Sequence, residues 1–277
     1  MPADFAADYK TLICDEVRPG VARITLNRPG VMNAYSDRMC EDLLAAIAAF
    51  RDDDALRALM LTGAGERAFC TGGDLSGGDR DSQVRPPVAA TPMGHGRQMR
   101  EGMQAVVLAL RRLDKPSVAM IRGYAVAGGL ALAMGCDFRF AAHSAKLGDT
   151  SNKAGLLPDE GGAWLFPRAM GLDRALKMTL LHEIYPAPEA ERLGLVTEVV
   201  PDDDLEVRTL AFCEALAAKA PLAVRLSKMM MEKAMDVGLE ASMADAQMAV
   251  MITNPSHDAR EGIAAFREKR TPKFEGR

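Results

Sequence analysis

The sequence has little that indicates secretion, membrane insertion or nucleic-acid binding. Its 277 residues include only five cysteines, and none are spaced as C-x-x-C, so neither a disulfide framework nor a zinc site is indicated. No apolar run approaches the ~20 residues that a membrane-spanning helix needs. A formal net charge of −4 provides no basic field for nucleic acid or an anionic membrane surface.

Two further absences bear on location and chemistry. The N-terminus, MPADFAADYK, lacks the basic-then-apolar pattern of a signal peptide, so we expect a cytoplasmic protein. The four histidines are dispersed, and His95 and His143 stand in loop-like or polar surroundings, so no metal site is predicted. The composition that remains, 48% hydrophobic and 26% charged, is that of an ordinary soluble globular protein.

Strand-like and helix-like segments alternate through the first 200 residues. Short apolar runs bounded by turn residues predict strands at residues 11–17, 21–26, 58–62 and 117–121. Helices are expected after Ser36, which is a good N-cap residue, and over 104–113. This alternation favours an α/β core.

The pattern changes after Pro201. Residues 202–268 have helical periodicity, almost no strand signal, and breaks near Pro221, Gly238 and Pro255. We therefore predict a core domain over residues 1–200 and a helical domain of three or four helices over 201–277. The many methionines of this second part are expected to serve packing or a subunit interface.

Residues 76–98 are rich in Gly, Pro, Asp and Arg and have no periodicity, which predicts a mobile loop. One interpretation is a lid that closes over substrate and excludes water. The other is a solvated surface insertion without a role.

Two glycine-containing segments could present backbone N–H groups to a negatively charged oxygen. In AFCTGGDL (68–75) a glycine pair follows a predicted strand, and in GYAVAGGLALAM (123–134) a helix begins at glycines. Neither matches a nucleotide-phosphate motif. Two such N–H groups converging on one oxygen would form an oxyanion hole, although tight turn packing explains either segment alone.

The stretch GLLPDEGGAW (155–164) places two carboxylates, Asp159 and Glu160, ahead of a predicted helix. Acidic residues there can cap the helix and favour its positive end. Gly161 and Gly162, however, are poor helix formers. A catalytic acid or base is the alternative, and it gains support if the two glycine segments lie nearby.

Taken together, the motifs have the order found in a known family. AFCTGGDL and GLLPDEGG accompany ITLNRPGVMNA (24–34), KPSVAMIRGYAVAGGLALAMGCD (115–137) and AERLGLVTEVV (190–200). From about Tyr9 to Phe274 the chain resembles the crotonase superfamily of enoyl-CoA hydratases and isomerases. The resemblance implies an α/β fold: a crotonase-like spiral of ββα units with a C-terminal α-helical trimerisation domain.

The resemblance also implies the substrate and assembly. An acyl-CoA thioester would bind with its oxygen between the backbone N–H groups of Gly73 and Gly128. Coenzyme A would enter as part of the substrate, and no separate cofactor is expected. The expected assembly is a homotrimer, or a hexamer made of two trimers.

Two departures from the hydratases affect the expected reaction. The two glutamates that hydratases use fall at Ala131 and Ser151 here, and neither side chain replaces a carboxylate. Asp159 instead matches the acid of several isomerases in the superfamily and the nucleophilic aspartate of aromatic-CoA dehalogenases. Glu160 is expected to be a first-turn helix residue with a secondary catalytic role.

For coenzyme A the resemblance implies contacts from two N-terminal segments and from the C-terminus. The residues concerned are Arg28, Val31, Met32, Gly72, Asp74, Leu75, Phe266 and Lys269. The last two lie in AFREKR, which would reach a neighbouring subunit's nucleotide or form a solvated charged face. A basic residue that family members often have is Gly30 here.

The resulting prediction is an enoyl-CoA isomerase. One carboxylate can take a proton from C2 and return it at C4 while the oxyanion hole holds the enolate, and Asp159 is the predicted acid/base. The alternatives are a hydratase acting on an unusual acyl group, with Asp159 or Glu160 positioning water, and an acyl-CoA-binding relative without activity.

Overall fold

A computed structural model describes residues 4–75 and 92–277 and contains two sheets. The larger sheet has the order β1 (Leu12–Arg18), β2 (Val21–Leu26), β3 (Ala58–Gly63), β5 (Ser117–Ile121), β7 (Phe138–Ala142) and β10 (Glu198–Val200). The smaller sheet has the order β4 (Ala68–Cys70), β6 (Tyr124–Val126), β8 (Lys146–Gly148) and β9 (Ile184–Pro186). The β1–β2 and β8–β9 pairs are antiparallel, and all other pairs are parallel.

Helices follow the strand pairs and then form the C-terminal part. Their bounds are α1 (Asp37–Asp52), α2 (Pro92–Glu101), α3 (Met103–Arg111), α4 (Gly128–Gly135), α5 (Gly162–Met170), α6 (Leu172–Leu181), α7 (Ala187–Arg192), α8 (Leu205–Ala217), α9 (Pro221–Ala234), α10 (Leu239–Thr253) and α11 (His257–Glu268). Three times in succession, a strand of the larger sheet leads to a strand of the smaller one and then to a helix. This is the predicted spiral of ββα units.

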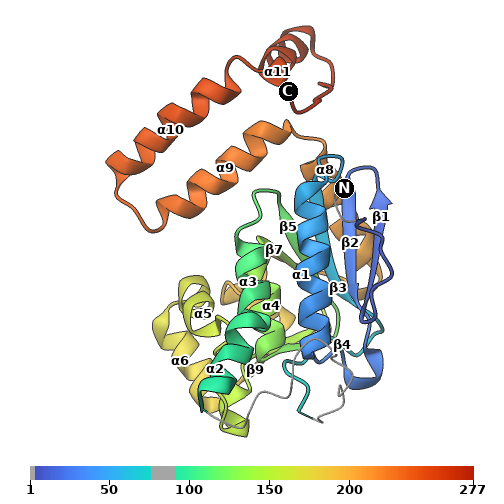
Figure 1. Ribbon diagram of the computed structural model, residues 1–277, viewed down its shortest axis with the longest axis vertical. Coiled ribbons are helices and arrows are strands. Elements are labelled where there is room, and N and C mark those ends of the chain that lie inside the picture. Colours follow the sequence, from blue (N-terminus) through green and yellow to red (C-terminus); the bar gives the residue numbers. More distant parts are fainter. Residues whose placement is uncertain (1–3, 76–91) are drawn as a thin grey trace.

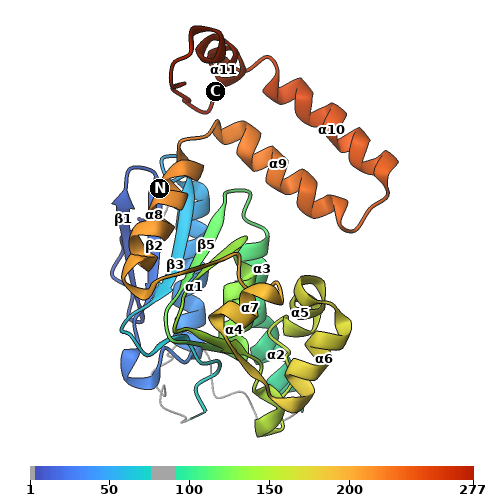
Figure 2. The ribbon, with the colours of Figure 1, turned by 180° about the vertical axis from the view of Figure 1, so that it is seen from behind.

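The core lies between the larger sheet and the helices on its two faces. Strand β5 is buried throughout, as expected for a strand in a sheet that is covered on both sides. Every residue of α4 is also buried, which explains why its sequence is apolar on all faces. In Figure 1 α1 lies in front of the larger sheet and α8 behind it, and Figure 2 shows the reverse.

The C-terminal part is helical, as predicted, and contains α8 to α11. Helix α8 packs on the larger sheet through buried side chains that include Leu205, Leu210 and Cys213. Helices α9 and α10 form a hairpin that projects from the core and leads to α11 (Figure 1). The domain boundary at residues 200 and 201 stays a prediction. No helix in the described part of the chain is long and apolar enough to cross a membrane.

Most local predictions are confirmed, and two are wrong. Strands β2 and β5 have the predicted bounds, and the Ser36 side chain caps α1 by accepting a hydrogen bond from the backbone N–H of Met39. The loop predicted over residues 76–98 is wrong for 92–98, which belong to α2; residues 76–91 and the proposed lid lie outside the described residues.

The second correction concerns the carboxylates ahead of α5. This helix begins at Gly162, and its N-cap is Gly161, whose φ of 117° suits only glycine. No side chain caps the helix and no acidic residue lies in its first turn. The capping interpretation of Asp159 and the first-turn position of Glu160 are therefore both wrong, and the two side chains are left to other roles.

Candidate active site

The first oxyanion segment is held in place by Tyr35. The backbone N–H of Tyr35 donates to the carbonyl oxygen of Gly72 at 2.8 Å, and the N–H of Asp74 donates to the carbonyl oxygen of Tyr35 at 2.9 Å. These two hydrogen bonds form a parallel β-bridge between Tyr35 and Gly73, and they use backbone groups of Gly72 and Asp74 rather than those of Gly73 itself. The N–H of Gly73 has no acceptor among residues 4–75 and 92–277. It is therefore available to a ligand.

The second segment brings a helix N-terminus to the same place. Ala127 has φ 51° and ψ −129°, a strained conformation for a residue with a side chain, and α4 begins at the next residue, Gly128. First-turn N–H groups have no partner within their own helix. A Cβ added at Gly72 would lie 3.3 Å from the backbone nitrogen of Gly128, so the two segments touch. The predicted pair of N–H donors is therefore brought together.

Glu160 lies beside these glycines and is buried. The Tyr35 hydroxyl donates a hydrogen bond of 2.6 Å to Oε1 of Glu160, whereas Oε2 has no partner in the described part of the chain. A Cβ added at Gly128 would overlap the Glu160 carboxylate and lie 2.8 Å from Cε1 of Tyr35. Burial raises the pKa of Glu160, and the hydrogen bond from Tyr35 opposes this rise only in part.

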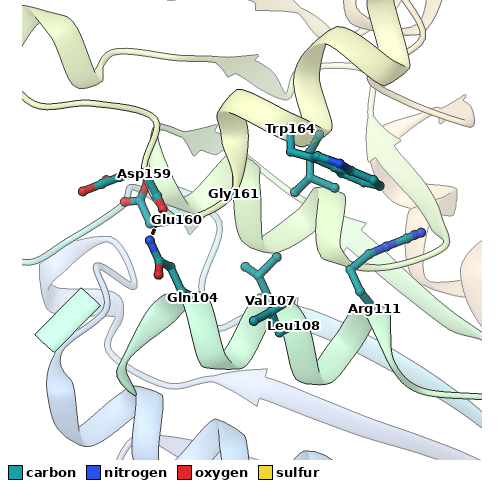
Figure 3. A pocket seen from close by; sticks show the side chains of 9 residues that line it. Gln104, Val107, Leu108, Arg111, Asp159, Glu160, Gly161 and Trp164 are labelled. Atoms are coloured by element: carbon teal, nitrogen blue, oxygen red, sulfur yellow. Dashed lines mark hydrogen bonds between the residues drawn. The ribbon is translucent and has the colours of Figure 1, made fainter. Parts of the chain in front are cut away.

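Asp159 has a different environment from its neighbour. Its backbone oxygen accepts a hydrogen bond of 2.7 Å from Nε2 of Gln104, drawn in Figure 3, and the residue is exposed. Adjacent carboxylates thus have separate surroundings, one accessible to a ligand and one buried beside the oxyanion glycines. An accessible carboxylate next to a buried one whose pKa is raised is an arrangement suited to acid/base work.

Two cavities meet at these carboxylates. The larger, about 850 Å³, is lined by residues that include Tyr35, Gly73 and Ala127. The smaller, about 350 Å³, lies between α3 and α5. Asp159, Glu160 and Gln104 line both of them. A ligand that extends from one cavity into the other passes both acidic residues.

The positions where hydratases have glutamates contain no acid. Ala131 is buried within α4. Ser151 lines the larger cavity, but its hydroxyl donates a hydrogen bond of 2.7 Å to Oδ1 of Asp149. Asp149 in turn accepts a hydrogen bond from Thr179 at its other oxygen. The Ser151 hydroxyl is thereby oriented toward Asp149, and the position itself supplies no carboxylate to a ligand.

The residues predicted to contact coenzyme A fall into two groups. Arg28 forms an ion pair of 2.8 Å with Asp74, which joins the two N-terminal segments, and Gly72 lies in the second of these. In this group Asp74 and Leu75 line the larger cavity, while Val31 and Met32 lie at least partly exposed at a short helical turn.

The second group, Phe266 and Lys269, lies on or just after α11, at the opposite end of the molecule from β4 and the glycine loop (Figures 1 and 2). Both residues are exposed. They do not contact the site of their own chain, and the predicted contact with a neighbouring subunit's nucleotide stays a prediction.

Sequence reasoning missed Tyr35 and Gln104. Both act through long-range contacts, Tyr35 with Glu160 and Gln104 with Asp159. The only local signal was that Tyr35 stands between the motif ITLNRPGVMNA (24–34) and the capping residue Ser36.

Comparisons with known proteins show which family the chain resembles in sequence and fold. Residues 16–277 match the family model described as enoyl-CoA hydratase/isomerase. The chain is 36% identical to (E)-benzylidenesuccinyl-CoA hydratase of Thauera aromatica, covering 94% of this chain and 98% of that protein. It is 34% identical to 1,2-epoxyphenylacetyl-CoA isomerase of Escherichia coli (strain K12), covering 96% and 98%. The crystal structure of an enoyl-CoA hydratase from Bacillus anthracis superposes with a TM-score of 0.89 at 32% identity, covering 97% of this chain and all of that one.

Proposed function

This chain belongs to the enoyl-CoA hydratase/isomerase family, and on that premise we propose that it is an enoyl-CoA isomerase with Asp159 as the acid/base. The observation that carries the proposal is the junction of the two cavities. Asp159 lines both, Gly73 lines the larger of them, and Asp159 is accessible where Glu160 is buried. If a thioester lies along the two cavities, its C2 and C4 atoms lie beside the Asp159 carboxylate.

The proposed reaction needs one proton carrier and one anion site. The thioester oxygen accepts hydrogen bonds from the N–H groups of Gly73 and Gly128, which stabilise the enolate that forms when C2 loses a proton. Asp159 takes that proton and returns it at C4, so that the double bond moves from C3 to C2. Ala131 and Ser151 support this choice, because neither offers a carboxylate at the two positions where hydratases have the glutamate pair used for water addition.

Hydration is the second candidate, and Glu160 favours it. A buried carboxylate beside Asp159 provides a second acidic group, so that one of the two takes a proton from the water that adds at C3 and the other donates a proton to C2. Relatives that are named as hydratases and as isomerases are about equally similar to this chain. The two reactions are therefore separated by assay.

The test uses the purified enzyme with two substrates. We expect a 3-enoyl-CoA to be converted to the 2-enoyl-CoA, and Asp159→Asn to lose at least a hundredfold in kcat while it still binds the thioester. Asp203→Asn, which alters an exposed aspartate in another part of the chain, is the matched control. Full activity of Asp159→Asn would remove this residue from the mechanism.

Two other outcomes separate the alternatives. Rapid conversion of crotonyl-CoA to 3-hydroxybutyryl-CoA would establish the hydratase instead. Tight thioester binding without turnover of any 2-enoyl or 3-enoyl thioester would indicate an acyl-CoA-binding relative without activity.

A further inference from the structure

The smaller cavity is a short apolar pocket that begins at the carboxylates. Val107 and Leu108 of α3 form one wall, and Trp164 and Leu165 of α5 form the other. Figure 3 shows Trp164 facing Val107 and Arg111 across this space. Since the pocket opens beside Asp159, it is the place for the part of the acyl group beyond the reacting carbons. This step rests on the proposed function.

An ion pair lies at the end of the pocket away from the carboxylates. Nη2 of Arg111 lies 3.3 Å from Oε1 of Glu232 on α9. From Gln104, near the carboxylates, to Arg111 is seven residues of helix, or ~10 Å at 1.5 Å per residue. Beyond this distance a long alkyl chain would lie against the charged Arg111 and Glu232 or in solvent, where its apolar surface gains little. The pocket therefore fits a compact group better than a long one.

Trp164 gives the pocket a flat aromatic wall. It is the only tryptophan of the chain, and 42% of its surface is exposed. The guanidinium carbon of Arg168 lies 3.8 Å from its ring centroid and that of Arg111 lies 5.9 Å from it. No other aromatic ring among the described residues pairs with it. Aromatic rings gain energy from one another beyond what their buried area gives, and guanidinium groups also stack on aromatic faces.

We propose that this pocket binds an acyl group that ends in a single aromatic ring, packed against Trp164. The size agrees, because a cavity of ~150 Å³ lined by apolar side chains binds benzene. The cavity of about 350 Å³ holds one ring together with the carbons that link it to the thioester. The substrate class is thus the aryl-acyl-CoA thioesters rather than those of long straight-chain fatty acids.

Because Trp164 is the only tryptophan, its fluorescence reports binding in this pocket directly. The probes are 3-phenylpropanoyl-CoA and nonanoyl-CoA, two thioesters that have equal numbers of acyl carbons and no alkene double bond. Free coenzyme A, which has no acyl group, is the third probe. We expect the aryl thioester to change the emission of Trp164 and to bind about tenfold more tightly than nonanoyl-CoA, as one favourable ring contact predicts. Equal or tighter binding of nonanoyl-CoA would overturn the proposal.

A variant separates ring stacking from general apolar contact. Trp164→Leu keeps an apolar side chain, and calorimetry replaces fluorescence as the readout. We expect this variant to lose most of the tenfold preference while its affinity for nonanoyl-CoA changes by less than about threefold. The matched control is Tyr124→Leu, which removes another half-exposed ring that lies beneath a cation, that of Lys146, and lines neither cavity. An unchanged preference in Trp164→Leu would contradict the proposal.

These measurements use unreactive thioesters, so they do not depend on which reaction the enzyme catalyses. An aryl preference without turnover would leave the pocket assignment intact and contradict the isomerase. Isomerase activity without any aryl preference would do the reverse.

Discussion

Tyr35 joins the parts of the site at the scale of single residues. Its backbone pairs with the Gly73 loop, its ring contacts both oxyanion glycines, and its hydroxyl holds Glu160. Each of these contacts comes from a different segment of the chain. The geometry of the oxyanion hole is thus set by side-chain packing on one tyrosine as well as by the glycine backbone.

A methyl group at Gly128 should disrupt this arrangement. The added Cβ of Gly128→Ala would overlap the Glu160 carboxylate and press on the Tyr35 ring, so the N–H donor must move. Loss of one oxyanion donor typically lowers kcat by about a hundred- to a thousandfold, and we expect a loss of that order. Steady-state kinetics on a 3-enoyl-CoA measures it. Gly238→Ala is the control, because a Cβ there meets nothing within 4 Å; similar losses in both variants would contradict the prediction.

Glu160 should make stability depend on pH. Burial raises its pKa in the folded state above the model value of 4.5, so between these two pKa values the folded state binds more protons than the unfolded state. Stability from this group is then greatest below pH 4.5 and falls as the pH rises through the folded-state pKa. Glu160→Gln cannot ionise and should escape this fall.

Urea unfolding from pH 4.5 to 8 tests the expectation. The difference in unfolding free energy between Glu160→Gln and the unaltered protein should move in favour of the variant as the pH rises. Asp173→Asn, which alters an exposed carboxylate on α6, is the control variant. A difference for Glu160→Gln that stays constant over the whole range would show that Glu160 titrates alike in the folded and unfolded states.

At the scale of elements, sequence patterns predicted those strands and helix starts that depend on neighbouring residues in the chain. Strand β5 reads as an apolar run because both faces of the sheet are covered, and α1 begins where Ser36 can accept a hydrogen bond from the backbone. The start of α5 was misjudged for a physical reason. Acidic residues ahead of a helix look like caps, but the Glu160 side chain is held by a tyrosine 125 positions away along the chain. No local pattern contains that contact.

The candidate site was predictable only in part for the same reason. The motif order located Gly73, Gly128 and Asp159; in the structure Gly73 and Asp159 line the larger cavity, and Gly128 lies against Glu160, which also lines it. Which of two adjacent carboxylates is buried depends on how the chain turns at Gly161, and this follows from packing rather than from sequence spacing.

The cap of α1 provides a prediction at this scale. Ser36→Ala removes an acceptor for the Met39 N–H, which typically costs about 1 kcal/mol. Because α1 packs on the core, we expect the loss in the global free energy of unfolding, measured with urea. Ser256 caps α11 in the same way, through the N–H of Ala259. Since α11 lies beyond the projecting hairpin, Ser256→Ala should instead increase hydrogen exchange in α11 alone; equal global losses in both variants would contradict this difference.

At the scale of the whole molecule, the hairpin of α9 and α10 leaves a large apolar surface uncovered. Its exposed apolar side chains are Met229, Met231, Met235, Leu239, Met243, Met248, Val250, Met251 and Ile252. A soluble monomer rarely exposes so many apolar groups in one region. Methionine side chains, which are flexible and polarizable, are well suited to packing against a partner surface.

We therefore expect this chain to self-associate through the hairpin, as a homotrimer or as two such trimers. Light scattering on the purified protein should give three or six times the mass of 29.8 kDa. Met243→Glu combined with Met251→Glu would place charges in the buried interface, and we expect this variant to be smaller, because unpaired charges are costly to bury. Val207→Glu alters an exposed apolar residue on α8, outside the hairpin, and should keep the assembly. A monomeric parent protein would contradict the expectation directly.

Phe266 and Lys269 lie at this same end of the molecule, far from the site of their own chain. If a neighbouring subunit supplies these two residues to the coenzyme A site, the smaller variant should also have a raised KM for acyl-CoA.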